Sequence, residues 1–149
     1  MPLLFAFAQS QEAADEVVID AQAIYYASCA GCHGAVGEGQ EGRIPALADH
    51  VPHVYNAEGG RDYLMHVLMY GLSGEITVLG ETFDGSMPPR YTLSNDELAA
   101  VLNFVLTEWG NDALLGPDFE PYAADELNTV RRLSRNWALQ FRPAVDPEL

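Results

Sequence analysis

The sequence predicts an all-α domain of about three main helices, followed by a C-terminal helical extension. Three stretches of the 149-residue chain repeat apolar side chains every three to four residues, which is the period of a helix: 15–32, 61–70 and 94–109. Loops rich in glycine and proline separate these stretches. A short motif with the chain's two cysteines closes the first stretch. We place the domain at residues 15–112 and the extension at 113–149.

The first predicted helix carries one apolar stripe and delivers the cysteine motif at its end. Its stripe consists of residues at helical spacing, namely Val17, Val18, Ala21, Ile24, Tyr25 and Ser28. The motif that follows is Cys29-Ala30-Gly31-Cys32-His33.

This motif is the attachment signature of a c-type haem. Cys29 and Cys32 lie one helical turn apart, so they can form thioether bonds to the two vinyl groups of one porphyrin. His33 then lies under the iron, where its imidazole serves as the proximal ligand. The sequence therefore predicts one covalently bound haem c, with Cys29 and Cys32 as the attachment residues.

The long loop over residues 34–61 supports a bound group of this kind. A structureless loop of this length is unusual in a compact domain unless something fills the space beside it, and a haem does so. A backbone carbonyl near Pro45 is placed to accept a hydrogen bond from the His33 ring, which would fix its orientation and raise its basicity.

The second predicted helix, 61–70, ends at Gly71 as a C-cap, and residues 72–93 follow as loop or short strand. Within them, Met87 is the expected distal iron ligand, because a thioether is a soft neutral ligand and Pro88 and Pro89 stiffen its loop. Other methionines and histidines are weaker alternatives, since helical methionines usually fill cores and such histidines are usually solvated or satisfied; these are Met65, Met69, His50, His53 and His66.

The third helix has the clearest start. Ser94 and Glu97 fit a capping box, and Leu93 and Leu98 are placed as its hydrophobic staple. The buried side runs from Leu98 through Leu106 to Trp109, and Gly110 ends the helix. We expect the first and third helices to cross, with Ala21 and Tyr25 meeting Val101 and Phe104.

Two other interpretations of the cysteines are weaker. A zinc site would add His50 and His53, but the two histidines are closer together than in zinc fingers. A redox-active Cys-x-x-Cys of thioredoxin type requires a βαβ context that this helical chain lacks. With His33 and Met87 both on the iron there is no open position, which favours electron transfer over catalysis. Without Met87 on the iron, an open-site haem enzyme or sensor is the alternative.

The chain is strongly acidic, with 22 acids against 7 bases and a net charge of −15 at pH 7. All seven bases are arginine. This balance excludes nucleic-acid binding, which needs a basic surface, and favours redox partner proteins that dock through a basic surface.

Haem propionates need donors, and few bases precede residue 131. Arg43 and Arg61 are the first candidates, with Tyr55 and Trp109 as weaker ones; Arg90 follows the Met87 loop and is equally consistent with a surface position.

The extension is predicted to form a helix over 123–141 whose apolar side is surrounded by arginines. Packing back onto the domain is the expectation. Contact with a membrane surface is the alternative, because the helix combines arginines with large apolar residues; these residues are Arg131, Arg132, Arg135, Arg142, Trp137 and Phe141.

The chain's first residues form a short apolar run. Residues 3–8 end in Ala6-Phe7-Ala8, which resembles the cleavage site of a secretory signal, so residues 1–8 are interpreted as a signal-peptide remnant. Export agrees with haem attachment to cysteine, which takes place on the far side of the membrane. We therefore expect a periplasmic protein.

Together these motifs resemble the class I (mitochondrial-type) cytochromes c, and more closely the small bacterial ones. The resemblance rests on Cys29-x-x-Cys32-His33, Pro45-x-Leu47, Gly-x-Met87-Pro88 and the helix that runs to Trp109-Gly110-Asn111, in that order. It implies three main helices around one haem, Met87 as distal ligand and the Pro45 carbonyl on His33. It also implies a periplasmic electron carrier or, alternatively, the haem subunit of a dehydrogenase complex (for example one that oxidises sulfur compounds or alcohols). The absence of lysine and the extension depart from the mitochondrial pattern.

Overall fold

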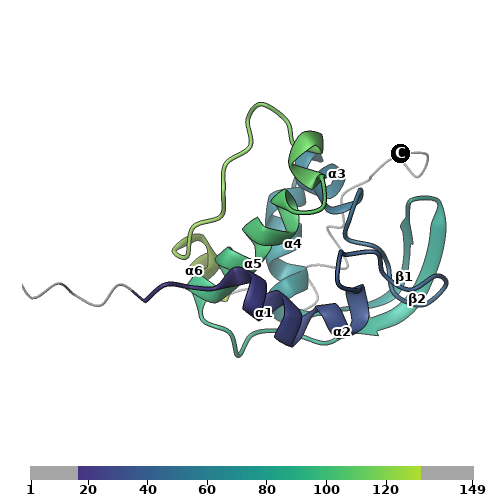
Figure 1. The fold of residues 1–149 in the computed structure, drawn as a ribbon, viewed down its shortest axis with the longest axis horizontal. Helices are drawn as coiled ribbons and strands as arrows, with labels where there is room; N and C mark the ends of the chain where they lie inside the picture. The colour runs from purple at the N-terminus through teal and green to yellow at the C-terminus, as the bar shows by residue number, and fades with distance from the viewer. Residues whose placement is uncertain (1–16, 132–149) are drawn as a thin grey trace, which may run out of the picture.

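Two helices from opposite ends of the domain cross at its centre in the computed structural model, which describes residues 17–131 (Figure 1). They are α1 (Ala21–Ser28) and α5 (Asn95–Thr107). Tyr25 of α1 is fully buried, and its ring centroid lies 5.4 Å from that of Phe104. The predicted contact between Tyr25 and Phe104 is therefore confirmed.

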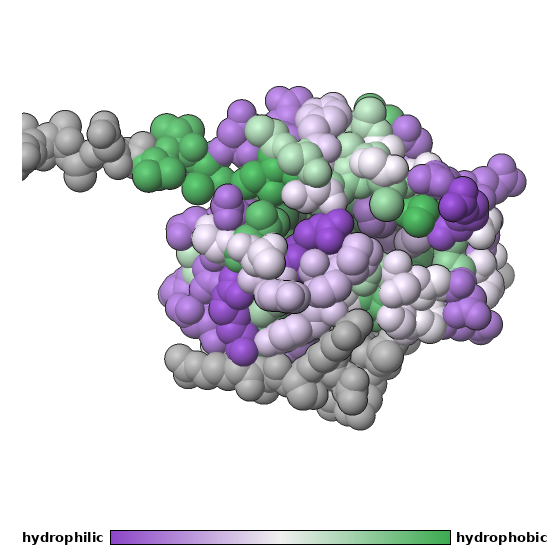
Figure 2. Space-filling model, turned by 90° about the horizontal axis from the view of Figure 1, so that it is seen from below, coloured by the Kyte–Doolittle hydropathy of each residue, from purple (hydrophilic) through white to green (hydrophobic). Residues whose placement is uncertain are grey.

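The first helix is shorter than predicted at both ends. The Asp20 side chain accepts a hydrogen bond from the Ala23 amide and caps the helix, so Val17 and Val18 stay outside it with 79% and 86% of their surface exposed. Figure 2 shows the start of the described chain as an apolar stretch that extends from the body. At Cys29 the helix breaks, and a short second helix, α2 (Ala30–His33), carries the rest of the motif. Residues 1–8, the predicted signal remnant, lie outside the described residues.

The predicted loop over 34–61 contains a helix, α3 (Val51–Asn56), with Pro52 in its first turn, where a missing amide hydrogen leaves no bond unmade. The next helix, α4 (Gly60–Tyr70), matches the predicted 61–70. Gly71 ends it as predicted, at a positive φ of 75°, and a side chain there would collide with the Met87 carbonyl. Only glycine lets the chain turn so close to Met87.

The all-α prediction is wrong in one part, because residues 72–87 form an antiparallel hairpin. Strand β1 (Leu72–Val78) pairs with β2 (Glu81–Met87), and Leu72 lies opposite Met87. The two turn residues between the strands, Leu79 and Gly80, have φ values of 50° and 78°, the left-handed pair that suits a tight hairpin. Apolar and polar residues alternate along β1, which is the pattern of a half-buried strand.

Helix α5 begins as predicted, since both hydrogen bonds of the capping box between Ser94 and Glu97 are present. It ends at Thr107, so Trp109 lies beyond the helix in which it was predicted. A 3-10 turn, η1 (Asn111–Leu114), follows. The buried core of the domain is formed mainly by α4 and α5 with Tyr25.

The extension packs back onto the domain as far as the structure describes it. Its helix α6 (Glu126–Val130) buries Leu127 completely and Val130 almost completely. Tyr122, which precedes it, is 4% exposed. The rest of the predicted helix 123–141, including Arg132, Arg135, Trp137 and Phe141, lies outside the described residues, as does Arg142.

The hairpin and α6 lie at opposite ends of this arrangement (Figure 1). In Figure 1 the hairpin lies at the right and α6 at the left, with α1, α4 and α5 between them. None of the helices among residues 17–131 is long and apolar enough to cross a membrane.

Candidate haem-binding site

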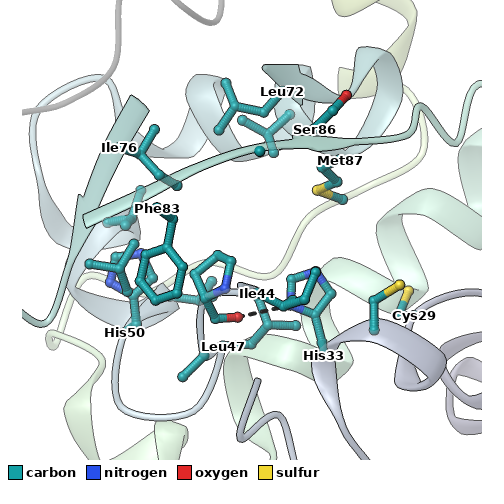
Figure 3. Close-up of a pocket in the computed structure, with 18 of the residues that line it drawn as sticks. Cys29, His33, Ile44, Leu47, His50, Leu72, Ile76, Phe83, Ser86 and Met87 are labelled. Carbon is teal, nitrogen blue, oxygen red and sulfur yellow. Dashed lines mark hydrogen bonds between the residues drawn. The ribbon is translucent and has the colours of Figure 1, made fainter. Parts of the chain in front are cut away.

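A cavity lies between α2, the chain that follows it, and the hairpin (Figure 3). Its empty space, open solvent included, is about 1040 Å³. Most of its wall is apolar, with contributions from α3, α4 and both strands; the apolar residues include Ile44, Leu47, Val51, Val54, Leu64, Val67, Leu72, Ile76, Val78 and Phe83. Such a wall suits a large, flat, apolar ligand.

His33 projects from the end of α2 into this cavity. Its Nδ1 lies 3.0 Å from the carbonyl oxygen of Pro45, which can only accept, so Nδ1 carries the proton and Nε2 remains for a ligand. This is the hydrogen bond expected near Pro45. Burial lowers the pKa of His33 below its ordinary value; the bond to Pro45 opposes this effect, and the charge of Arg90 adds to it. The lowered pKa favours the neutral ring, the state in which imidazole binds a metal.

Met87 lies on the opposite side of the cavity from His33 (Figure 3). It is the last residue of β2, directly before Pro88 and Pro89. The hairpin aims it, because every second residue of a strand faces the same side. Phe83, Gly85 and Met87, at alternate positions of β2, line the cavity, and Ser86 at the end of the strand borders it as well.

The same alternation shapes the β1 side of the wall. Leu72, Gly74, Ile76 and Val78 line the cavity, while the residues between them do not. Gly74 lies opposite Gly85 in the register, and Ile76 lies opposite Phe83. The wall is therefore bare of side chains at the glycine pair and bulky beside it, which leaves room for a flat group to approach the backbone.

Cys29 and Cys32 both line the cavity and are not joined to each other. Cys29 is partly buried, and desolvation raises the pKa of its thiol, whereas Cys32 is exposed. Cys29 lies beside His33 in Figure 3. Both sulfurs are thus available at the edge of the cavity that carries the predicted proximal histidine.

Three basic side chains line the cavity besides His33: Arg43, His50 and Arg90. Arg43 was predicted here, and so was Pro45, which lines the cavity as well. His50, expected to be a solvated or satisfied side chain, is 8% exposed. The sequence left open whether Arg90 faces the haem or the surface. Its position three residues after Met87 was the one feature that indicated the cavity.

Arg61 and Tyr55 were predicted to face the haem propionates, but the structure places them elsewhere. The Arg61 guanidinium pairs with Glu126, with 2.6 Å between Nη2 and Oε1, and Nη1 donates to the Tyr55 hydroxyl. Tyr55 in turn donates to the carbonyl of Glu120. Neither residue lines the cavity. A carboxylate in the extension, distant in sequence, captures this arginine.

Trp109 is also not among the cavity-lining residues. Its ring packs on Tyr25, with centroids 5.0 Å apart, and on Phe104. It also fills the space beside Gly37, where any side chain would collide with it. Trp109 therefore supports the α1–α5 crossing and does not donate to the cavity.

The other candidate iron ligands differ in whether they border the cavity. Met65 and Met69 are buried in the core, 3% and 0% exposed, as expected for helical methionines. Of the three alternative histidines, His50 alone lines the cavity. Within residues 17–131, no cluster of three or more His, Cys, Asp or Glu side chains could hold a metal ion, so the zinc interpretation gains no support there.

Comparison with known proteins agrees with this site. The family model for cytochrome c matches residues 18–109. Two curated relatives, both cytochrome c-552 from Thermus thermophilus, are each 46% identical over 106 residues. The matches cover 71% of this chain and 80% and 71% of the relatives. The chain therefore belongs to the cytochrome c family, as an electron-transfer protein with one covalently bound haem c.

Proposed function

We propose that this cytochrome carries single electrons between redox proteins in the periplasm, with His33 and Met87 as the two axial ligands of its haem iron. One observation carries the proposal: the two side chains enter the same cavity from opposite sides (Figure 3). Imidazole on one face and thioether on the other is a ligand pair typical of cytochromes c, and it raises the reduction potential.

The remaining residues around the cavity fit a covalently attached porphyrin. Cys29 and Cys32 would form the thioether bonds, and the Pro45 carbonyl would hold the His33 ring in the orientation that keeps Nε2 towards the iron. Arg43, which lines the cavity, is the proposed donor to a propionate. Each of these roles needs only atoms that already border the cavity.

This ligand set suits an electron carrier. When bound, the haem would supply a one-electron Fe(III)/Fe(II) couple. His33 and Met87 together would leave no coordination position for a substrate. The apolar wall would exclude water from the haem faces, so little would have to rearrange when the charge changes.

Location and partners follow from attachment chemistry and charge. Covalent haem attachment to cysteines takes place on the far side of the cytoplasmic membrane, which supports a periplasmic location. The net charge of −15 favours partners that present a basic surface. Association with such a partner would slow as salt screens the attraction.

Visible spectra of two matched variants test the ligand assignment. Met87→Leu and Met65→Leu each replace a methionine by a side chain of similar volume. The oxidised wild-type protein and the Met65→Leu variant should show the weak far-red sulfur-to-iron band, and Met87→Leu should lack it. Survival of the band in Met87→Leu would refute the assignment.

Reduction kinetics test the role as a carrier. The purified protein should be reduced and reoxidised by separate basic redox proteins, at rates that fall with ionic strength. Purification as a stable complex with a catalytic chain would instead favour a dehydrogenase subunit.

A further inference from the structure

Arg90 joins the two segments that carry the proposed iron ligands. Its Nε and Nη2 both donate to the carbonyl oxygen of Ser28, at 3.2 and 2.7 Å. Ser28 directly precedes Cys29, whereas Arg90 itself follows Met87 by three residues. A forked donor on one acceptor fixes the guanidinium, because two of its N–H groups must point to the same place.

The backbone around Arg90 is held as well. Its amide donates to the carbonyl of Leu68 in α4, at 3.0 Å, and Nη1 reaches the carbonyl of Pro89, at 3.3 Å. The segment after Met87 is therefore tied to α4 by its main chain and to the end of α1 by a side chain. Met87 is therefore held from both sides in the chain. The strand pairing before it keeps it opposite Leu72, and the contacts of Arg90 fix the segment after it.

The positive charge of Arg90 has no acidic partner at contact distance among residues 17–131. All of its hydrogen-bond acceptors there are neutral backbone carbonyls, and the ion pair formed within these residues is that of Arg61 with Glu126. The guanidinium is partly buried and lines the cavity. A charge in such a place is screened less than one in water, so its field acts across the cavity.

We propose that Arg90 is a positioning residue that ties the Met87 segment to the Cys29–His33 segment and whose charge raises the reduction potential of the haem. This inference rests on the proposed function, since it takes Met87 as the distal ligand. A fixed cation disfavours the iron state with the higher positive charge, so it favours Fe(II) over Fe(III). The tie to Ser28 resists movement of Met87 away from the iron.

Two variants of the haem-loaded full chain separate charge from geometry. Arg90→Gln removes the charge and the forked contact, whereas Arg90→Lys keeps the charge but cannot place two N–H groups of a planar fork on Ser28. The matched control is Arg131→Gln. Arg131 also donates to carbonyls of the segment after Met87, those of Tyr91 and Leu93, but it does not line the cavity.

Two measurements are made on each protein: an equilibrium redox titration, and the binding of imidazole to the oxidised protein, which reports how readily Met87 leaves the iron. Arg90→Gln should lower the equilibrium constant for reduction about three- to tenfold, tenfold being about 59 mV for one electron. Arg90→Lys should keep most of the potential. Both variants should bind imidazole about tenfold more tightly than wild type, and Arg131→Gln should match wild type in both measurements.

The inference fails if Arg90→Gln and Arg131→Gln have the same potential and the same imidazole affinity. If Arg90→Gln does not load haem, the imidazole affinity of Arg90→Lys decides: an affinity equal to that of wild type overturns the positioning role. Failure of the proposed function looks different, because the wild-type protein itself would then lack the far-red band.

Discussion

Arg61 and Arg90 each connect distant parts of the chain through backbone carbonyls, but they do so in different surroundings. Arg61 also meets a carboxylate, that of Glu126, and lies over the ring of Tyr122, 4.3 Å from its centroid. Arg90 meets only carbonyls within residues 17–131, and it borders the haem cavity. The charge of Arg61 is therefore paired with a carboxylate, whereas the charge of Arg90 has no such partner among the described residues.

The difference teaches how to assign an arginine in an acidic protein. Arg61 holds the extension to α4 through a paired charge, so its contribution is to stability. Arg90 holds two cavity segments with an unpaired charge, so its contribution extends to whatever the cavity binds. The free energy of unfolding and the reduction potential should therefore respond separately to changes in the two regions.

The largest effect on stability is expected from the extension. Leu127 of α6 is fully buried against the core, so Leu127→Ala should lower the free energy of unfolding by about 2–5 kcal/mol. The reduction potential should not change, because the residue does not border the cavity. Guanidinium unfolding and a redox titration measure the two quantities. Thr129→Ala, on the exposed side of the same helix, should stay within about 0.5 kcal/mol of wild type.

The second effect concerns Arg61 itself. Arg61→Gln removes the pair with Glu126 and the bonds to the Glu120 and Pro121 carbonyls, so it should cost about 1–3 kcal/mol. Its reduction potential should equal that of wild type. A shift in potential as large as that of Arg90→Gln would remove the distinction between the two arginines.

A smaller effect on stability is expected at the start of α5, the helix that packs against both α1 and α6. Ser94→Ala removes the capping hydrogen bond to the Glu97 amide and should cost about 1 kcal/mol, whereas Ser94→Gly should cost only a few tenths. Thermal unfolding of the two variants gives the comparison. A negligible loss in Ser94→Ala would show that the cap contributes little, and a change in potential would show that α5 transmits strain to the cavity.

The smallest effect is the pH dependence of the paired charge. The hydrogen bond from Arg61 lowers the pKa of Glu126 below the 4.5 of an unperturbed carboxyl. Because the pKa is lower in the folded state, the pair's contribution is present above about pH 4.5 and is lost as the pH falls through the folded value. As the pH is lowered from 7 to 3, the free energy of unfolding should therefore fall less steeply for Glu126→Gln than for wild type. Unfolding curves measured at each pH give this free energy. Parallel curves would mean that solvent screens the pair completely.

Helices α4 and α5 and the cysteine motif were predictable because their signals are local. Ser94 and Glu97 specify a helix start within four residues, and the Cys29–His33 motif specifies its ligand by spacing alone. Met87 was predicted as a ligand from the two prolines that follow it, and the structure places it at the cavity as the last residue of β2.

What could not be predicted depends on contacts between distant residues. Arg61 was assigned to the cavity because nothing near it in sequence shows that Glu126, 65 residues away, would capture it. The hairpin was left as loop or short strand, although the alternation from Leu72 to Val78 was visible, because two glycines weaken the strand pattern. Those glycines have a use that appears only when the register sets Gly74 opposite Gly85.

The hairpin register also limits how the length of this segment can change in evolution. Met87 faces the cavity because it sits opposite Leu72 in a ladder whose side chains alternate. Gain or loss of a single residue in one strand would turn the sulfur to the solvent side, unless a bulge absorbed it. One residue gained at the tip in each strand would leave Met87 in place. Insertions and deletions in this hairpin should therefore occur in matched pairs.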